Sequence, residues 1–242
     1  MLRPYPPSAR DDRPLQPPRP QILRLRRYTT SYRGSLPASQ RHSRRGGAVR
    51  IQATLRGLEF VFETQPGVFA HRDVDPGTRL LIEAMRVSPT ARVLDWGCGY
   101  GAIGIVAAKL APRGSAVLVD VDVRAARLAR RNLELNGVTN AEVVLGDGVR
   151  DLPPRSRFDV VCSNPPTHSG REVLEELVAG AYRVLRPRGQ LYLVVNRLLS
   201  LRREVETVFG NVETAARSKG YVAIRAVKLA AGRGDEDEGQ GG

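Results

Sequence analysis

One stretch decides the fold class: Val93-Leu94-Asp95-Trp96-Gly97-Cys98-Gly99-Tyr100-Gly101. Arg92–Asp95 is typical of a short buried strand, and Ala102–Leu110 is apolar on most faces, as in a buried helix. Glycines between the two allow a tight turn and a close approach of the backbone to a ligand. N–H groups left free where the helix starts would attract an anion, either a pyrophosphate or an amino-acid carboxylate. The stretch therefore predicts a strand, a ligand-binding loop and a helix.

Strands and helices alternate beyond this stretch, which predicts an α/β fold of the Rossmann-like kind. Such alternation favours a mostly parallel sheet that is covered by helices on both faces. The expected strands are Ser115–Asp120, Ala141–Leu145, Phe158–Cys162, Gln190–Val195 and Tyr221–Val227, and the expected helices are Val123–Asn136, Glu172–Leu185 and Leu198–Phe209.

A short extension precedes the alternating region. Val49–Leu55 and Leu58–Glu63 resemble two strands of a β-hairpin. Asp75 is a good N-cap with Pro76 at the first helical position, so we expect a helix that runs to about Arg86. We therefore divide the ordered chain into a hairpin and helix extension, residues 49–90, and a main domain, residues 91–230.

The two ends of the chain have the composition of disordered segments. Residues 1–48 are rich in Arg, Pro and Ser and have no sustained apolar period. They can therefore bury too little apolar surface to offset the conformational entropy lost on ordering. Residues 1–50 hold 12 Arg and two Asp, a net of +10 out of the formal +13 of the chain. Three interpretations compete: an RNA-binding arm, an organelle transit peptide, or translation from an over-extended start. Residues 231–242 are expected to be a solvated acidic tail.

Composition excludes several classes of protein. No apolar run approaches the roughly 20 residues of a membrane helix. Only two cysteines are present, Cys98 and Cys162, which gives no disulfide framework and fits a reducing cytoplasm. The three histidines stand far apart without the spacing of metal ligands, so no metal site is expected.

The cofactor is ambiguous from the glycine loop alone. Gly99-x-Gly101-x-x-Gly104 fits the dinucleotide fingerprint, and Asp120 follows Gly99 at the spacing of a ribose-binding acid. Two further acids favour S-adenosylmethionine. Asp95, two residues before Gly97, is placed to help hold the methionine amino end. Asp147 follows a strand, where its carboxylate could accept a hydrogen bond from the adenine amino group, although Asp147 also fits a simple turn.

The tetrapeptide Asn164-Pro165-Pro166-Thr167 indicates the chemistry. It follows an expected strand, at the sheet edge where open α/β folds bind ligands. The lone pair of an exocyclic or amide nitrogen is delocalised and poorly nucleophilic. The side-chain carbonyl of Asn164 and the backbone carbonyl of Pro165 can each accept a hydrogen bond from that amino group. They then aim its lone pair at a methyl carbon, and the prolines, Pro166 included, keep the loop rigid.

The chain resembles the methyltransferase small domain family of class I methyltransferases. It is similar in particular to small-subunit ribosomal RNA guanine-N2 methyltransferases. The shared motifs are Gly67-Val68-Phe69-Ala70, Asp75-Pro76-Gly77-Thr78, Val93-Leu94-Asp95-Trp96-Gly97-Cys98-Gly99, Asn164-Pro165-Pro166-Thr167-His168-Ser169-Gly170 and Phe209-Gly210-Asn211-Val212-Glu213.

This resemblance implies a seven-stranded sheet with an antiparallel last hairpin, S-adenosylmethionine as the methyl donor, and RNA guanine as the target. Several relatives carry two such domains, and this chain has one. Many members have an aromatic residue that stacks on the base where this chain has Thr167. Phe69 is then the candidate to flank the base, and His168 a candidate substrate contact.

Four alternatives remain open. Methylation of a protein glutamine or of adenine uses the same chemistry. A nicotinamide-dependent oxidoreductase would explain the glycines and Asp120 but not the Asn-Pro-Pro motif. A non-catalytic RNA-binding protein would rely on the arginine-rich segment.

Overall fold

The computed structural model describes residues 49–68, 73–166, 170–196 and 201–230. The strands are β1 (Val49–Leu55), β2 (Leu58–Thr64), β3 (Arg92–Trp96), β4 (Ser115–Asp120), β5 (Ala141–Leu145), β6 (Phe158–Ser163), β7 (Leu185–Asn196), β8 (Glu213–Ser218) and β9 (Tyr221–Val227). The helices are α1 (Pro76–Ala84), α2 (Ala102–Leu110), α3 (Val123–Leu135), the 3₁₀ turn η2 (Gly148–Asp151), α4 (Arg171–Val184) and α5 (Arg202–Phe209).

The main sheet has seven strands in the order β5-β4-β3-β6-β7-β9-β8. Strands β3 to β7 are parallel to one another, whereas β9 is antiparallel to both β7 and β8. The chain order reverses between β3 and β6, so β3 lies in the middle and its carboxyl end is the switch point where open α/β sheets bind ligands. The predicted α/β class, the seven strands and the antiparallel last hairpin are confirmed.

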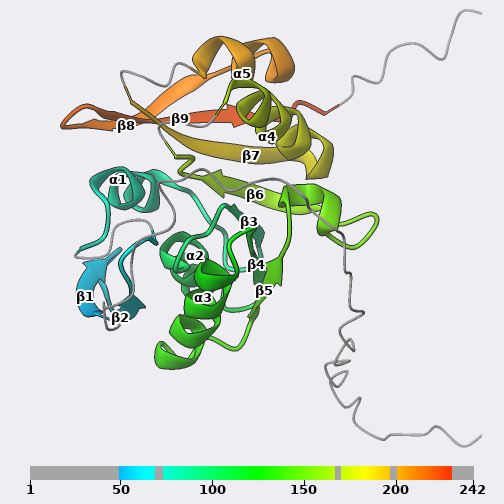
Figure 1. The fold of residues 1–242 in the computed structure, drawn as a ribbon. Coiled ribbons are helices and arrows are strands. Elements are labelled where there is room, and N and C mark those ends of the chain that lie inside the picture. The colour runs from blue at the N-terminus through cyan, green and yellow to red at the C-terminus, as the bar shows by residue number, and fades with distance from the viewer. Residues whose placement is uncertain (1–48, 69–72, 167–169, 197–200, 231–242) are drawn as a thin grey trace, which may run out of the picture. The chain divides into compact units, whose positions relative to one another are not determined.

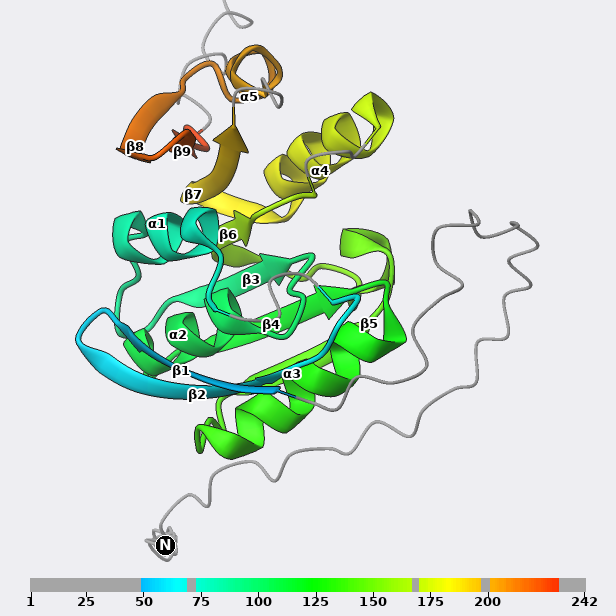
Figure 2. The same cartoon turned by 60° about the vertical axis from the view of Figure 1, so that its left-hand side comes forward.

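Helices cover both faces of the sheet (Figures 1 and 2). Helices α1, α2 and α3 lie on one face, and α4 and α5 lie on the other. Successive residues of a strand point to opposite faces, so the buried side chains divide into two clusters. Val93 and Leu118 belong to the cluster under α1, α2 and α3, and their neighbours Leu94 and Val119 belong to the cluster under α4 and α5.

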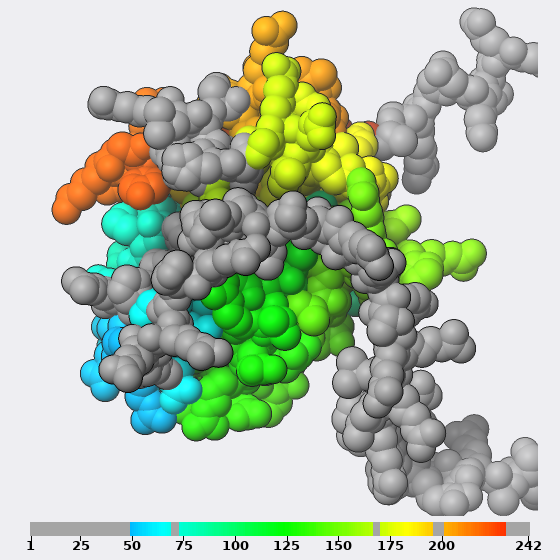
Figure 3. All heavy atoms as spheres, viewed as in Figure 1, coloured from blue at the N-terminus to red at the C-terminus, as the bar shows by residue number. Residues whose placement is uncertain are grey.

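The hairpin β1–β2 docks on α3 through two asparagines one helical turn apart. Because β1 pairs with only one edge of β2, the polar groups of the other edge need partners. Asn136 accepts from the N–H of Val61 at 3.1 Å and donates to its carbonyl at 2.8 Å. Asn132 makes the same pair of hydrogen bonds with Glu63. The space-filling view shows the hairpin, in blue, against α3, in green (Figure 3).

Two elements differ from the sequence-based expectations. Strand β8 is absent from the strands that the residue pattern predicts, although the family resemblance implies it. It is an edge strand without a buried residue, so it lacks the apolar signature of the inner strands. Leu185 was expected to end a helix, but it begins β7 and pairs with Phe158 of β6. The predicted hairpin and the N-cap at Asp75 are confirmed.

Candidate functional site

A cavity of about 380 Å³ opens at the carboxyl ends of the central strands. Its volume is in the range of small-molecule sites, roughly 300–1,000 Å³. Each of the strands β3, β4, β5 and β6 contributes the residues that end it or follow it. The walls are completed by Gly67, Val68 and Thr78 from the extension and by Val173, Leu174 and Leu177 from α4. A cavity therefore lies at the carboxyl edge of the sheet, where the sequence predicts a ligand site.

The glycine loop forms one side of the cavity, and left-handed backbone conformations explain its composition. Gly97, Gly99 and Gly101 have φ of 74°, 57° and 96°, which side chains with a Cβ rarely adopt. Gly97 and Gly99 line the cavity, and a Cβ at either position would meet nothing within 4 Å. The backbone of this loop is thus open to close approach by a ligand. Gly101 does not line the cavity; it begins α2 instead.

Most N–H groups of the glycine loop donate within the protein, whereas no hydrogen bond among the described residues uses those of Ala102 and Ile103, which begin α2 and line the cavity. The N–H groups of Gly97 and Cys98 donate to the carbonyl of Val119 at 2.9 and 3.0 Å. That of Gly101 donates to the carbonyl of Cys98 at 2.9 Å, and that of Gly99 to Asp120 at 2.8 Å. These bonds hold the loop in its shape, and the N–H groups of Ala102 and Ile103 are the ones left to meet an anion.

Asp120 ends β4 with its carboxylate at the cavity wall. One oxygen accepts from the N–H of Gly99 and the other from the N–H of Asp122, each at 2.8 Å. Burial raises the pKa of this carboxyl group, and these two hydrogen bonds oppose the shift. A carboxylate oxygen has room for further donors. Asp120 therefore anchors the glycine loop and can also accept hydrogen bonds from ligand hydroxyl groups.

Asp95 lies beneath the loop and is not among the residues that line the cavity. One carboxylate oxygen accepts from the N–H of Gly104 at 2.8 Å, and the other is buried without a partner among the described residues. Burial raises the pKa of Asp95 to about 7. The structure therefore places Asp95 under the start of α2, and its role at the methionine amino end stays a prediction.

Asp147 lies at the mouth of the cavity, after β5. It precedes η2 without forming a side-chain cap, so the turn does not use its carboxylate. Its backbone N–H donates to Asp151 at 2.6 Å. The next residue must be glycine, because a Cβ on Gly148 would lie 2.1 Å from the ring of Trp96. The exposed carboxylate of Asp147 is free to meet a ligand beside the Trp96 ring.

Asn164 follows β6 directly and lines the cavity together with Pro165 and Pro166. Its side-chain amide nitrogen donates to Asp75 at 2.9 Å and to Thr78 at 2.8 Å. None of the described residues donates to its carbonyl oxygen, and that oxygen is not among the buried unpaired atoms. The amide thus directs its one acceptor away from α1 and leaves it accessible.

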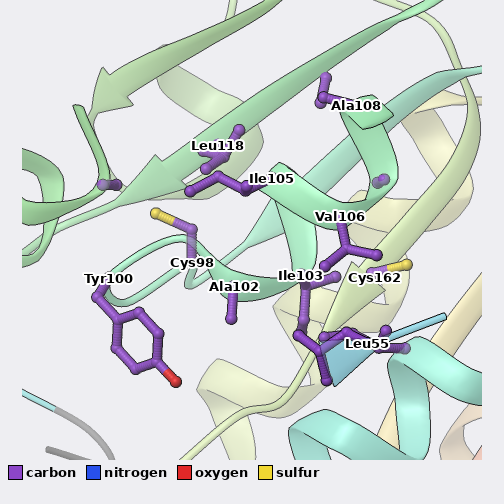
Figure 4. Packing of buried hydrophobic residues seen from close by; sticks show 14 of the residues in the cluster. Leu55, Cys98, Tyr100, Ala102, Ile103, Ile105, Val106, Ala108, Leu118 and Cys162 are labelled. Carbon is purple, nitrogen blue, oxygen red and sulfur yellow. The ribbon is translucent and has the colours of Figure 1, made fainter. Parts of the chain in front are cut away.

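The two cysteines are structural. Cys98 is on the glycine loop and Cys162 is in β6, apart from each other among buried apolar side chains (Figure 4). Burial raises the pKa of both thiols, so neither is a thiolate nucleophile. No group of three or more His, Cys, Asp or Glu side chains in the described part of the chain has metal-binding geometry. No helix described is long and apolar enough to cross a membrane.

Several cavity residues were not identified from the sequence. Val121 is 75% exposed and Val173 is 60% exposed, although both are large and apolar, and both line the cavity. Trp96 and Tyr100, inside the quoted glycine-loop stretch, also line it. Val121 could have been identified from the sequence, because it directly follows Asp120, the predicted ribose-binding acid at the end of a strand. Nothing in the sequence indicated that Thr78, on α1, would contact Asn164.

Three predicted substrate contacts, Phe69, Thr167 and His168, lie outside the described residues, as do residues 1–48 and 231–242. The segments that hold Phe69 and Thr167 adjoin cavity residues Val68 and Pro166. Their contacts stay predictions.

Comparisons with known proteins agree with this geometry. The ribosomal RNA large subunit methyltransferase G of Streptomyces avermitilis is 37% identical over 167 residues, which cover 67% of this chain and 44% of that protein. The uncharacterized protein YbxB of Bacillus subtilis is 31% identical over 179 residues, 72% of this chain and 89% of that protein. A solved structure of the T. thermophilus 16S rRNA guanine-N2 methyltransferase, in complex with AdoMet and guanosine, superposes with a TM-score of 0.68 at 32% identity.

That structure is matched over 75% of this chain and 50% of its own. This chain therefore spans about half the length of the two ribosomal RNA methyltransferases that it matches. The model of one family, the methyltransferase small domain, matches residues 59–225. Because this match covers more than half of its residues, the chain belongs to the methyltransferase small domain family.

Proposed function

We propose that this protein is an S-adenosylmethionine-dependent methyltransferase that methylates an exocyclic amino group, most specifically the N2 of guanine in ribosomal RNA. The observation that carries the proposal is the orientation of Asn164. Its amide nitrogen is occupied by Asp75 and Thr78, and its carbonyl oxygen is accessible in a cavity that also holds Asp120 and the glycine loop.

The cavity residues fit S-adenosylmethionine better than a dinucleotide. The N–H groups of Gly97, Cys98, Gly99 and Gly101 donate within the protein, which leaves those of Ala102 and Ile103 at the start of α2 for an anionic group such as the methionine carboxylate. Asp120 is suited to the ribose hydroxyls and Asp147 to the adenine amino group. The exposed side chain of Val121 offers an apolar surface to the adenine ring. The buried Asp95 supports the loop from below, beside the methionine end.

The proposed mechanism relies on orientation and on hydrogen-bond acceptors. When bound, the cofactor supplies an electrophilic methyl group on a sulfonium. Asn164 accepts a hydrogen bond from the target amino group, and the backbone carbonyl of Pro165 accepts the second. These acceptors stabilise positive charge as it develops on the nitrogen, which favours the transition state over the ground state. Pro165 and Pro166 restrict the loop, so the acceptors are held before substrate arrives.

Guanine in ribosomal RNA is favoured because the T. thermophilus relative is a 16S rRNA guanine-N2 methyltransferase solved with guanosine. The Streptomyces relative is named for the large ribosomal subunit, so the choice of subunit stays open. An RNA substrate of this kind, and two free cysteines, are consistent with action in the cytoplasm.

The deciding experiment supplies the purified protein with labelled S-adenosylmethionine, total RNA and, separately, total protein. Nucleosides and amino acids are then identified by mass spectrometry. We expect label in N2-methylguanosine of ribosomal RNA. Label in glutamine or in N6-methyladenosine would contradict guanine as the substrate but would still support methylation of an amino nitrogen. Calorimetry that finds NADH bound and S-adenosylhomocysteine ignored would overturn the proposal.

A further inference from the structure

The N-cap of α1 is also the partner of Asn164, although 89 residues separate Asp75 from it in the sequence. A single carboxylate oxygen of Asp75 accepts from the backbone N–H of Thr78 at 2.9 Å and from the Asn164 side chain at 2.9 Å. The hydroxyl of Thr78 accepts the second proton of the same amide at 2.8 Å. Both protons of the Asn164 amide are therefore bound by the first turn of one helix.

These two partners define which end of the amide faces the cavity. An ionised carboxylate can only accept hydrogen bonds, so the amide nitrogen must lie toward Asp75. If the amide were flipped, its oxygen would lie against the carboxylate oxygen of Asp75, and its nitrogen would replace the acceptor in the cavity. The flipped amide would have no acceptor for the target amino group.

Close packing of α1 on the sheet brings this helix turn within reach of Asn164. Gly77 lies between Asp75 and Thr78, and a Cβ there would lie 2.8 Å from both Val194 of β7 and Tyr221 of β9. Any larger residue would have to displace one of these side chains. The cap is thus packed on β9 and on β7, and β7 pairs with β6, the strand that Asn164 follows.

We propose that Asp75 and Thr78 are positioning residues, which hold Asn164 with its carbonyl oxygen toward the amino group to be methylated. This inference rests on the proposed function, because it gives the orientation of Asn164 a catalytic purpose. The extension that contains α1 then completes the active site of the main domain, in addition to covering one face of the sheet.

Two single variants and the double variant test whether these residues act by orienting Asn164 or only by stabilising the fold. Thr78→Val keeps the side-chain shape and removes one acceptor, and we expect kcat to fall about fivefold, the factor that one neutral hydrogen bond is worth. Asp75→Ser retains an N-cap for α1 but shortens the side chain, and we expect roughly a 10- to 100-fold fall for the loss of a charge-assisted bond. The double variant should fall further than either single one.

Three readouts exclude a general loss of structure. The KM for RNA and the affinity for S-adenosylhomocysteine, followed by fluorescence of the single tryptophan, Trp96, should change less than about threefold, because neither ligand needs the amide orientation to bind. Asp75→Asn, which restores a neutral acceptor of the right length, should recover part of the activity lost in Asp75→Ser. Thr207→Val, on the exposed side of α5, is the matched control and should leave kcat unchanged.

A nuclear magnetic resonance measurement tests the positioning without any activity. In the wild type the two side-chain amide protons of Asn164, assigned by their loss in Asn164→Ala, should exchange slowly with water. They should exchange faster in Asp75→Ser and Thr78→Val. Wild-type protein that shows this protection but transfers no methyl group contradicts the proposed function alone. Active wild type with unprotected amide protons, or with kcat unchanged in both variants, overturns the positioning role.

Discussion

The side-chain amide of Asn132 forms hydrogen bonds with both backbone polar groups of Glu63, accepting from its N–H at 2.7 Å and donating to its carbonyl at 2.9 Å. The second proton of the same amide goes to the carbonyl of Tyr100 in the glycine loop, at 2.8 Å. Asn132 is completely buried. One side chain on α3 therefore connects the N-terminal hairpin to the loop that forms the cavity wall.

Asn132→Ala should destabilise the fold strongly. The change leaves three backbone groups without partners, and each unpaired buried group costs about 1–3 kcal/mol. We expect the free energy of unfolding in urea to fall by roughly 3 kcal/mol or more. Arg127→Ala, on the exposed face of the same helix, should change it by less than about 0.5 kcal/mol. Equal stability of the two variants would mean that this asparagine does not connect the elements.

Asp120→Ala should weaken cofactor binding. The variant removes the acceptor proposed for the ribose hydroxyls and the bond that holds the N–H of Gly99. We expect the Kd for S-adenosylhomocysteine, measured by calorimetry, to rise about tenfold or more, since hydrogen bonds to a charged group are worth roughly 1.5–3 kcal/mol. Glu142→Ala removes an exposed acid from neighbouring β5 and should leave the Kd unchanged. A wild-type Kd in the Asp120 variant would remove Asp120 from the cofactor site.

Asn164→Ala should abolish nearly all methyl transfer while cofactor affinity stays within a few fold. The loss of one preorganised group that stabilises developing charge lowers kcat about a hundredfold or more. Asn164→Asp should not rescue activity, although it keeps an acceptor, because its second oxygen would face the carboxylate of Asp75. Single-turnover rates with labelled cofactor provide the measurement. Turnover at the wild-type rate in either variant would contradict the proposed mechanism.

The sequence could predict the positions of Asp120, Asp147 and Asn164 because each one ends or follows a strand. Parallel strands bring their carboxyl ends to one edge, so local patterns were enough to gather these residues. The same reasoning could not assign Thr78 and Asp75 to the site. As the N-cap of α1, Asp75 already had a local explanation, and its second partner depends on how α1 packs on β7 and β9.

Burial was the other property that the sequence did not reveal. Asp95 precedes the glycine loop and is predicted to help hold the methionine end, but the sequence did not show that it is fully buried or that its carboxylate accepts from the N–H of Gly104. Strand β8 was missed for the opposite reason. Its residues are exposed or half-buried at the sheet edge, so no apolar alternation marks it.

The buried carboxyl group of Asp95 should make stability depend on pH near neutrality. Its pKa in the folded protein is about 7, raised chiefly by burial from the ordinary value of 3.8. A raised pKa means that the folded state binds the proton more tightly than the unfolded state. The stabilising contribution is therefore complete below about pH 4 and is lost as pH rises through 7. For Asp95 alone the free energy of unfolding should fall by roughly 4 kcal/mol over this interval.

Asp95→Asn isolates this effect, because an amide can accept from the N–H of Gly104 but cannot ionise. Its nitrogen then occupies the position of the unpartnered oxygen, which adds a cost that does not vary with pH. Urea unfolding of both proteins at pH 5, 6, 7 and 8 provides the comparison. We expect the stability of the variant relative to the wild type to rise from pH 5 to about pH 7 and to level off between pH 7 and 8. Asp120, whose pKa is also raised, is present in both proteins and cancels in the difference. Parallel stability curves would show that Asp95 has the same proton affinity folded and unfolded, and hence that its carboxylate reaches solvent or a partner in solution.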